Sequence, residues 1–134
     1  MQPHSLVAIV TLLALLLYFW MGFRMVGARK VSGISAPDMT GHPILERTNR
    51  VHYNTLEWLP IFLVSLWLFA IYWRDDVAAV LGVVWIIGRI LYALAYVKDP
   101  SKRELGFMIQ TLACAALLFG ALGRLIYIYA TVRA

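Results

Sequence analysis

Two short rows of polar side chains interrupt otherwise apolar stretches of this chain. Arg50, Asn54 and Glu57 are spaced i, i+4 and i+7, so a helix would carry all three on one face. A second row at helical spacing consists of Arg89, Tyr92 and Tyr96. Arginine binds carboxylates as a planar fork, and a glutamate accepts hydrogen bonds from an amine. Together the two rows have the chemistry of a site for a charged ligand.

Basic side chains outnumber acidic ones near these rows. The bases are Arg29, Arg50, Arg89 and Arg103, and the acids are Glu46 and Glu57. An excess of fixed cations in a pocket of low dielectric favours an anionic ligand. A ligand with two carboxylates and one amine would suit the arginines and Glu57, and glutathione has this charge pattern. The alternative is that the charges only neutralise one another and stabilise the helix packing, with the two tyrosines as interfacial aromatics.

The composition predicts that membrane-spanning helices position these residues. Of 134 residues, 62% are apolar and 14% are charged, whereas soluble domains average about 45–50% and about 25%. A soluble enzyme is therefore disfavoured, and disorder is excluded. Because a span needs about 20 mostly apolar residues, four helices are predicted, over residues 5–27, 45–73, 77–97 and 102–130. The predicted fold is all-α: an integral membrane four-helix bundle with antiparallel spans, forming one domain over residues 1–134.

Local patterns refine these helices. Pro60 falls inside the second helix and should kink it. Ser101 and Glu104 match S-x-x-E, which predicts a capping box that opens the fourth helix and places Arg103 in its first turn. The first helix is not a secretory signal, because it lacks a basic n-region and a small-residue cleavage site.

The loops differ in charge. Most bases fall in or beside the first and third loops: Arg24, Arg29, Lys30, Arg47, Arg50, Lys98, Lys102 and Arg103. The positive-inside rule then places these two loops in the cytoplasm and both termini outside. The chain is expected to be a multi-pass protein of a bacterial inner membrane, because it is compact and has no recognisable retention signal.

The remaining reactive side chains indicate no further chemistry. His4, His42 and His52 lack metal-ligand spacing, so no metal is expected; His52 could line the ligand pocket. Cys114 falls in an apolar run and is expected to be buried and unreactive. No nucleic-acid partner is expected. Several aromatic residues are expected to face lipid or the interface, namely Tyr18, Phe19, Trp20, Trp58, Trp67, Trp73 and Trp85.

The second helix also carries a family resemblance. The pattern E-R-x-x-R-x-x-x-N-x-x-E at residues 46–57, followed by Pro60, resembles the signature of the MAPEG family, the membrane-associated proteins in eicosanoid and glutathione metabolism. The similarity covers the whole chain and includes Ala28-Arg29-Lys30 and the spacing from Arg89 to Arg103. The microsomal glutathione transferases and the cysteinyl-leukotriene synthase have the nearest pattern. His52, Trp58 and Lys30 depart from the leukotriene-synthase pattern, which has glutamine, tyrosine and arginine there.

The resemblance implies a homotrimer with glutathione sites at its subunit interfaces, near the cytoplasmic side. It implies that Arg103 stabilises the glutathione thiolate and that Arg29 reaches in from the neighbouring subunit. The other residues that it assigns to glutathione binding are Arg50, Asn54, Glu57, Tyr92 and Tyr96, with Arg89 nearby.

The function indicated is that of a membrane glutathione transferase. Its thiolate would attack a hydrophobic electrophile, or a lipid hydroperoxide in a peroxidase reaction, that arrives from the bilayer. The alternative is a non-enzymatic lipid-binding scaffold of the same fold. The family's member of that kind lacks the thiolate arginine, so the presence of Arg103 favours the enzyme. A transporter or channel is disfavoured because the polar residues gather at one end.

Overall fold

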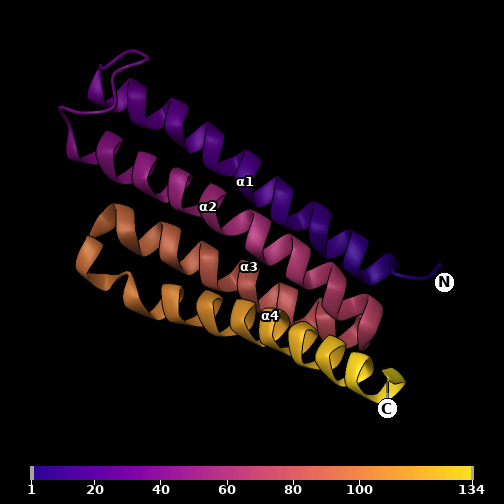
Figure 1. The fold of residues 1–134 in the computed structure, drawn as a ribbon. Helices are drawn as coiled ribbons and strands as arrows, with labels where there is room; N and C mark the ends of the chain where they lie inside the picture. Colours follow the sequence, from indigo (N-terminus) through magenta and orange to yellow (C-terminus); the bar gives the residue numbers. More distant parts are fainter. Residues whose placement is uncertain (1, 134) are drawn as a thin grey trace.

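The computed structural model describes residues 2–133, which form four long α-helices lying side by side (Figure 1). Their bounds are α1 (Ser5–Ser32), α2 (Pro43–Tyr72), α3 (Asp75–Lys98) and α4 (Glu104–Arg133), with a short 3-10 helix, η1 (Pro100–Lys102), between the last two. All four α-helices are long and apolar enough to cross a membrane. The prediction of an all-α membrane protein with four helices is confirmed, whereas the homotrimer and the antiparallel order stay predictions.

Local chemistry sets the ends of the first two helices. α1 continues past its predicted end to Ser32 and stops at Gly33, whose φ of 71° favours glycine. The Gly33 N–H donates to the Arg29 carbonyl at 2.9 Å. At the start of α2, the Nδ1 of His42 accepts from the N–H of Ile44 at 3.1 Å, which caps the helix. The helix then continues through Pro60.

The predicted capping box before the fourth helix is wrong. Ser101 lies within η1, where its N–H and hydroxyl donate to Asp99 Oδ1 at 3.0 and 2.8 Å. These bonds hold the pKa of the Asp99 carboxyl below its ordinary value. α4 begins only at Glu104, and the Arg103 carbonyl accepts its first hydrogen bond, from Phe107 N–H at 3.1 Å. Arg103 therefore directly precedes the helix instead of lying in its first turn, because Asp99 engages the serine.

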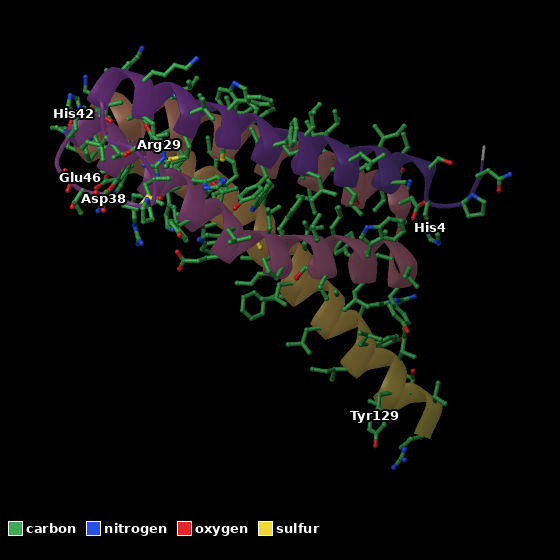
Figure 2. The ribbon with its side chains drawn as sticks, turned by 90° about the horizontal axis from the view of Figure 1, so that it is seen from above. His4, Arg29, Asp38, His42, Glu46 and Tyr129 are labelled. Atoms are coloured by element: carbon green, nitrogen blue, oxygen red, sulfur yellow. The ribbon has the colours of Figure 1, made fainter. Side chains whose placement is uncertain are left out.

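The first and third connections lie at the same end of the bundle. Arg47 at the start of α2 donates through Nη1 to the Lys98 carbonyl at 3.3 Å, so the start of α2 lies beside the end of α3. We call this end, which carries residues 33–42 and 99–103, the basic end. Figure 2 shows its labelled residues Arg29, Asp38, His42 and Glu46 close together, far from His4 and Tyr129 at the other end.

Aromatic packing fills the centre. The rings of Phe62 in α2 and Trp85 in α3 stack with centroids 4.0 Å apart and planes 2° apart, and both side chains are fully buried. The prediction that Trp85 faces lipid or the interface is wrong. α3 packs against all three other α-helices, and Trp85 lies on its inner side against Phe62, whereas Val80 and Ile87 of the same helix are exposed.

Two glycines bring α3 and α4 into close contact. A Cβ atom on Gly106 of α4 would lie 2.3 Å from the backbone nitrogen of Tyr92, and one on Gly88 of α3 would lie 2.6 Å from that of Gln110. Small residues allow such backbone approach between membrane helices. The contact sets Tyr92 beside the first turn of α4, immediately after Arg103.

Gly106→Ala should destabilise the protein, because its methyl group would clash with backbone atoms that cannot move independently. Overpacking typically costs about 1–3 kcal/mol. Thermal unfolding in detergent should show a lower midpoint. Gly123→Ala is the matched control on the same helix, since a Cβ there meets nothing within 4 Å. Equal midpoints for the two variants would contradict the close contact.

Candidate functional site

A buried cation links α3 to α2. Arg89 is fully buried, and its Nη2 donates to Asn54 Oδ1 at 2.9 Å and to Thr55 Oγ1 at 2.8 Å. The Thr55 hydroxyl in turn donates to the Val51 carbonyl at 2.8 Å. Among residues 2–133, the Nε and Nη1 of Arg89 have no hydrogen-bond partner and no carboxylate lies within 4.0 Å. The structure thus places Arg89 behind Asn54, inside the bundle.

A row of aromatic rings runs from Arg89 to the basic end. The Arg89 guanidinium carbon lies 4.5 Å from the centroid of the buried Tyr92 ring, and the Tyr92 and Tyr96 rings are 5.5 Å apart. The guanidinium carbon of Arg103 lies 5.9 Å from the Tyr96 ring. Arginine above a ring face is attracted by its quadrupole. The structure therefore brings Arg89, Tyr92, Tyr96 and Arg103 together as one connected row.

The α2 row points outward. Arg50 Nη1 and Glu57 Oε1 lie 3.9 Å apart, and their side chains are 58% and 61% exposed. Asn54 lies between them and is half-buried, and it is the residue that connects this face to Arg89. The predicted stripe of Arg50, Asn54 and Glu57 is thus present, with charges on the outer surface and an amide at the junction with α3.

Arg29 is engaged by its own loop. Its Nη1 donates to the Asp38 carbonyl at 2.8 Å, and its Nη2 contacts the Met39 sulfur at 3.3 Å. In this chain it does not meet the α2 row. Beside that row is a hollow of about 280 Å³ that the loop helps to form. Its lining residues are Met39, Thr40, Glu46, Asn49, Arg50 and Tyr53.

His52 lies apart from the other predicted ligand residues. Its ring stacks on Tyr18 of α1, with centroids 4.6 Å apart and planes 12° apart. Two residues along a helix turn the side chain by roughly 200°, so His52 faces away from Arg50. Within this chain, His52 stabilises the contact between α1 and α2.

Sequence reasoning missed two residues of the site. Thr55 is the second acceptor for Arg89, and the ring of Phe107 lies 5.7 Å from that of Tyr92. A buried arginine requires acceptors on a neighbouring helix, which could have directed attention to Thr55. The position of Phe107 depends on the glycine contact between α3 and α4, which no spacing pattern in the sequence indicates.

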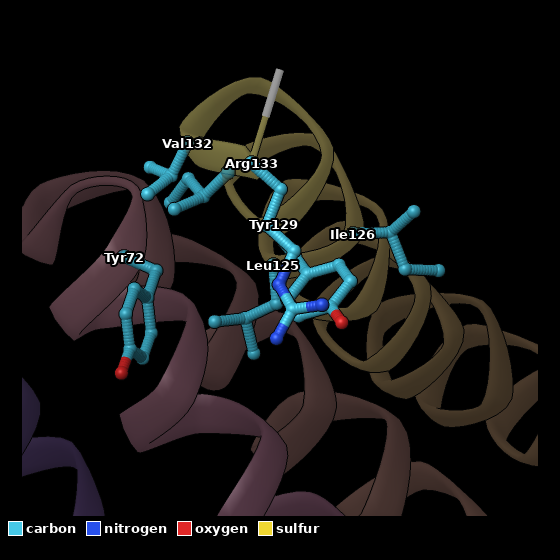
Figure 3. A pocket seen from close by; sticks show the side chains of 7 residues that line it. Tyr72, Leu125, Ile126, Tyr129, Val132 and Arg133 are labelled. Atoms are coloured by element: carbon cyan, nitrogen blue, oxygen red, sulfur yellow. The ribbon is translucent and has the colours of Figure 1, made fainter.

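A larger hollow lies elsewhere. It measures about 610 Å³ and contains none of the predicted ligand residues. Figure 3 shows Tyr72 of α2 across from Leu125, Tyr129 and Arg133 of α4. Its walls are almost entirely apolar, in contrast to the charged and polar row of the candidate site.

Metal ligation finds no support in the part of the chain that the structure describes. Residues 2–133 contain no group of three or more His, Cys, Asp or Glu side chains that could hold a metal ion. Cys114 is buried within α4. The side chains gathered at the candidate site are those of arginine, asparagine, glutamate and tyrosine.

Comparisons with known proteins identify the family of this chain. The model of the MAPEG family matches residues 7–123. An uncharacterized protein of Synechocystis sp. is 46% identical over 115 residues, 86% of this chain and 84% of that protein. Human microsomal glutathione S-transferase 2 is 35% identical over 119 residues, 88% of this chain and 81% of that protein.

A leukotriene C4 synthase, from Cavia porcellus, is 34% identical over 99 residues, 74% of this chain. The match spans 66% of that synthase. These matches confirm the resemblance carried by the pattern at residues 46–57. Because the family model and the relatives align along most of its length, the chain belongs to the MAPEG family.

Proposed function

We propose that the protein is a membrane glutathione transferase. The row that joins Asn54 through Arg89, Tyr92 and Tyr96 to Arg103 is the observation that carries the proposal. It supplies polar and cationic groups along one path from the membrane interior to the basic end. Support also comes from relatives that are named glutathione S-transferase and leukotriene C4 synthase.

The outward α2 row provides the charges that glutathione requires. Arg50 would bind a carboxylate, and Glu57 would accept from the amine of the γ-glutamyl group. Asn54, held by Arg89, would present its amide to the peptide backbone. The hydroxyls of Tyr92 and Tyr96 would add hydrogen bonds. Arg29 of α1 and His52, on the face of α2 that packs against α1, would bind the ligand from a neighbouring subunit.

Arg103 would stabilise the thiolate. A free thiol has a pKa near 8.5, and lowering it by about two units requires roughly 2.7 kcal/mol. A cation about 4 Å away contributes roughly 4 kcal/mol at an effective dielectric near 20, and desolvation of the thiolate opposes this. Arg103 also immediately precedes α4, where the positive end of the helix dipole adds to its charge.

The second substrate would come from the bilayer. The thiolate attacks an electrophilic carbon, a carbon–sulfur bond forms, and the leaving group departs with its electron pair. With a hydroperoxide, the thiolate would attack the terminal oxygen and release an alcohol, and a second glutathione would reduce the sulfenic acid to disulfide and water. Cys114 is buried within α4, so the reacting sulfur in either reaction would be that of glutathione.

A homotrimer would complete the site. Arg50 and Glu57 project from a membrane-length helix and are more than half exposed in the single chain. Charged groups on such helices normally face a bundle interior or a water-filled cavity. A neighbouring copy that covers this face would enclose the two charges in such an environment. Cytoplasmic placement of the basic end and a bacterial inner membrane remain predictions.

Arg103→Ala should strongly reduce the fraction of glutathione thiolate that forms at neutral pH. If the arginine lowers the pKa by about two units, the thiolate fraction at pH 7 falls roughly 25-fold without it. The conjugation rate should fall by a similar factor and recover at alkaline pH, where the thiol ionises unaided. The readouts are thiolate absorbance in a glutathione titration and the rate with a chromogenic electrophile. Lys102→Ala is the control; a full thiolate signal in Arg103→Ala would refute the role.

Glu57→Gln should weaken glutathione binding more than it slows the reaction. Losing a charge-assisted contact to the amine should raise the Kd roughly tenfold, while the rate at saturating glutathione stays within about twofold. Calorimetric titration and steady-state kinetics measure the two quantities. Asp38→Asn, in the first loop, removes an acid outside the α2 row and serves as the control. An unchanged Kd would count against the assignment.

Native mass spectrometry of detergent-released protein should give the mass of three chains of 15.2 kDa each. The charged outer face of α2 should form part of the interface, so Glu57→Lys should shift the population toward smaller species. Active protein with the mass of a monomer or dimer would overturn the trimer.

A further inference from the structure

An apolar groove lies between α1 and α3. It measures about 380 Å³, within the range of about 300–1,000 Å³ typical of small-molecule sites. Its walls include Leu13, Leu16 and Trp20 of α1 and Ile86, Ile90 and Leu94 of α3. None of the residues proposed above to bind glutathione lines it.

A cation without an acidic partner lies at one end of this groove. Arg24 follows Trp20 by one helical turn, and its guanidinium carbon lies 5.1 Å from the centroid of the Trp20 ring. Across residues 2–133, no carboxylate comes within 4.0 Å of it. The side chain is half-buried within a membrane-length helix, where an uncompensated charge is costly.

The α3 wall also ends in a cation toward the basic end, Lys98, which follows Leu94 by four residues. Met21 of α1 packs in one cluster with Ala93 of α3. One further turn of α1 reaches Arg24, and Lys98 is the last residue of α3. Both walls are thus apolar toward the membrane centre and basic toward the basic end, with Trp20 at the transition.

We propose that this groove binds one acyl chain of an anionic phospholipid, with the phosphate bound by Arg24 and Lys98. An apolar channel with cations at its interfacial end is complementary to an amphiphile with a negative headgroup. An uncharged electrophile would leave Arg24 unpaired. A second copy of the chain in the groove would also leave Arg24 unpaired unless it placed an acidic residue beside it. The bound lipid would stabilise α1 against α3 in the segment that leads to Arg29.

The test uses the full chain in detergent micelles without glutathione, so its result does not depend on the proposed function. The probes are phosphatidylglycerol and phosphatidylcholine with identical brominated acyl chains, which quench nearby tryptophans. The Trp20 contribution is the difference between the protein and Trp20→Phe. Half-quenching should need about thirtyfold less phosphatidylglycerol, because each of the two cations near an anionic headgroup contributes about 1 kcal/mol.

Arg24→Gln should reduce this preference to about fivefold, because Lys98 remains, and Arg24→Lys should retain it. Arg133→Gln is the matched control, because Arg133 also stacks on a ring, 4.8 Å from Tyr129, at the other end of the bundle. Equal half-quenching by the two lipids, or an equal loss of preference in Arg133→Gln, would overturn the proposal. If neither lipid quenches Trp20, and a reactive side chain engineered in place of Leu16 cross-links two copies, the groove is instead occupied by a second copy. This result would also overturn the proposal.

Discussion

The positive charge of Arg89 is the constraint on which the interior depends. It lies nine residues before the end of α3, about 13 Å into the helix, where a lone arginine costs roughly 2.5–3.5 kcal/mol. Two hydrogen bonds to α2 and the face of Tyr92 offset that cost. Since the acceptors belong to another helix, α2 and α3 can satisfy the charge only at one register. That register places Asn54 between the buried Arg89 and the outward-facing charges of the α2 row.

The close contact between Gly88 of α3 and Gly106 of α4 also fixes the position of α4 relative to α3. Without side chains at Gly88 and Gly106, the two backbones approach closely enough for Phe107 to pack on Tyr92. α4 starts two residues before Gly106, so the position of the glycine also determines where Arg103 stands relative to Tyr96. A site built from three helices is thereby fixed by two local constraints, a buried charge and a close backbone approach.

These constraints explain which parts of the site could be predicted from sequence. Helical spacing placed Arg50, Asn54 and Glu57 on one face because that relation lies within one helix. Thr55 depends on how α2 turns toward α3, which spacing within one helix does not encode. The capping box failed for a similar reason, since the nearby Asp99 competes for Ser101. Hydropathy alone could not show that Trp85 lies on the enclosed side of α3.

The two polar rows differ in how they are satisfied, and this separates structural from ligand-binding charge. The chain itself supplies acceptors for Arg89, which offset the cost of burying its charge and fix Asn54 in place. Within residues 2–133, the charged partner of Arg50 is Glu57, at 3.9 Å, and both side chains are largely exposed. Such an exposed pair contributes about 1 kcal/mol at most, too little to offset the exposure of two charges to lipid. The stability of the single chain therefore does not account for these two charges, which is why the proposal assigns them to a ligand and a neighbouring subunit.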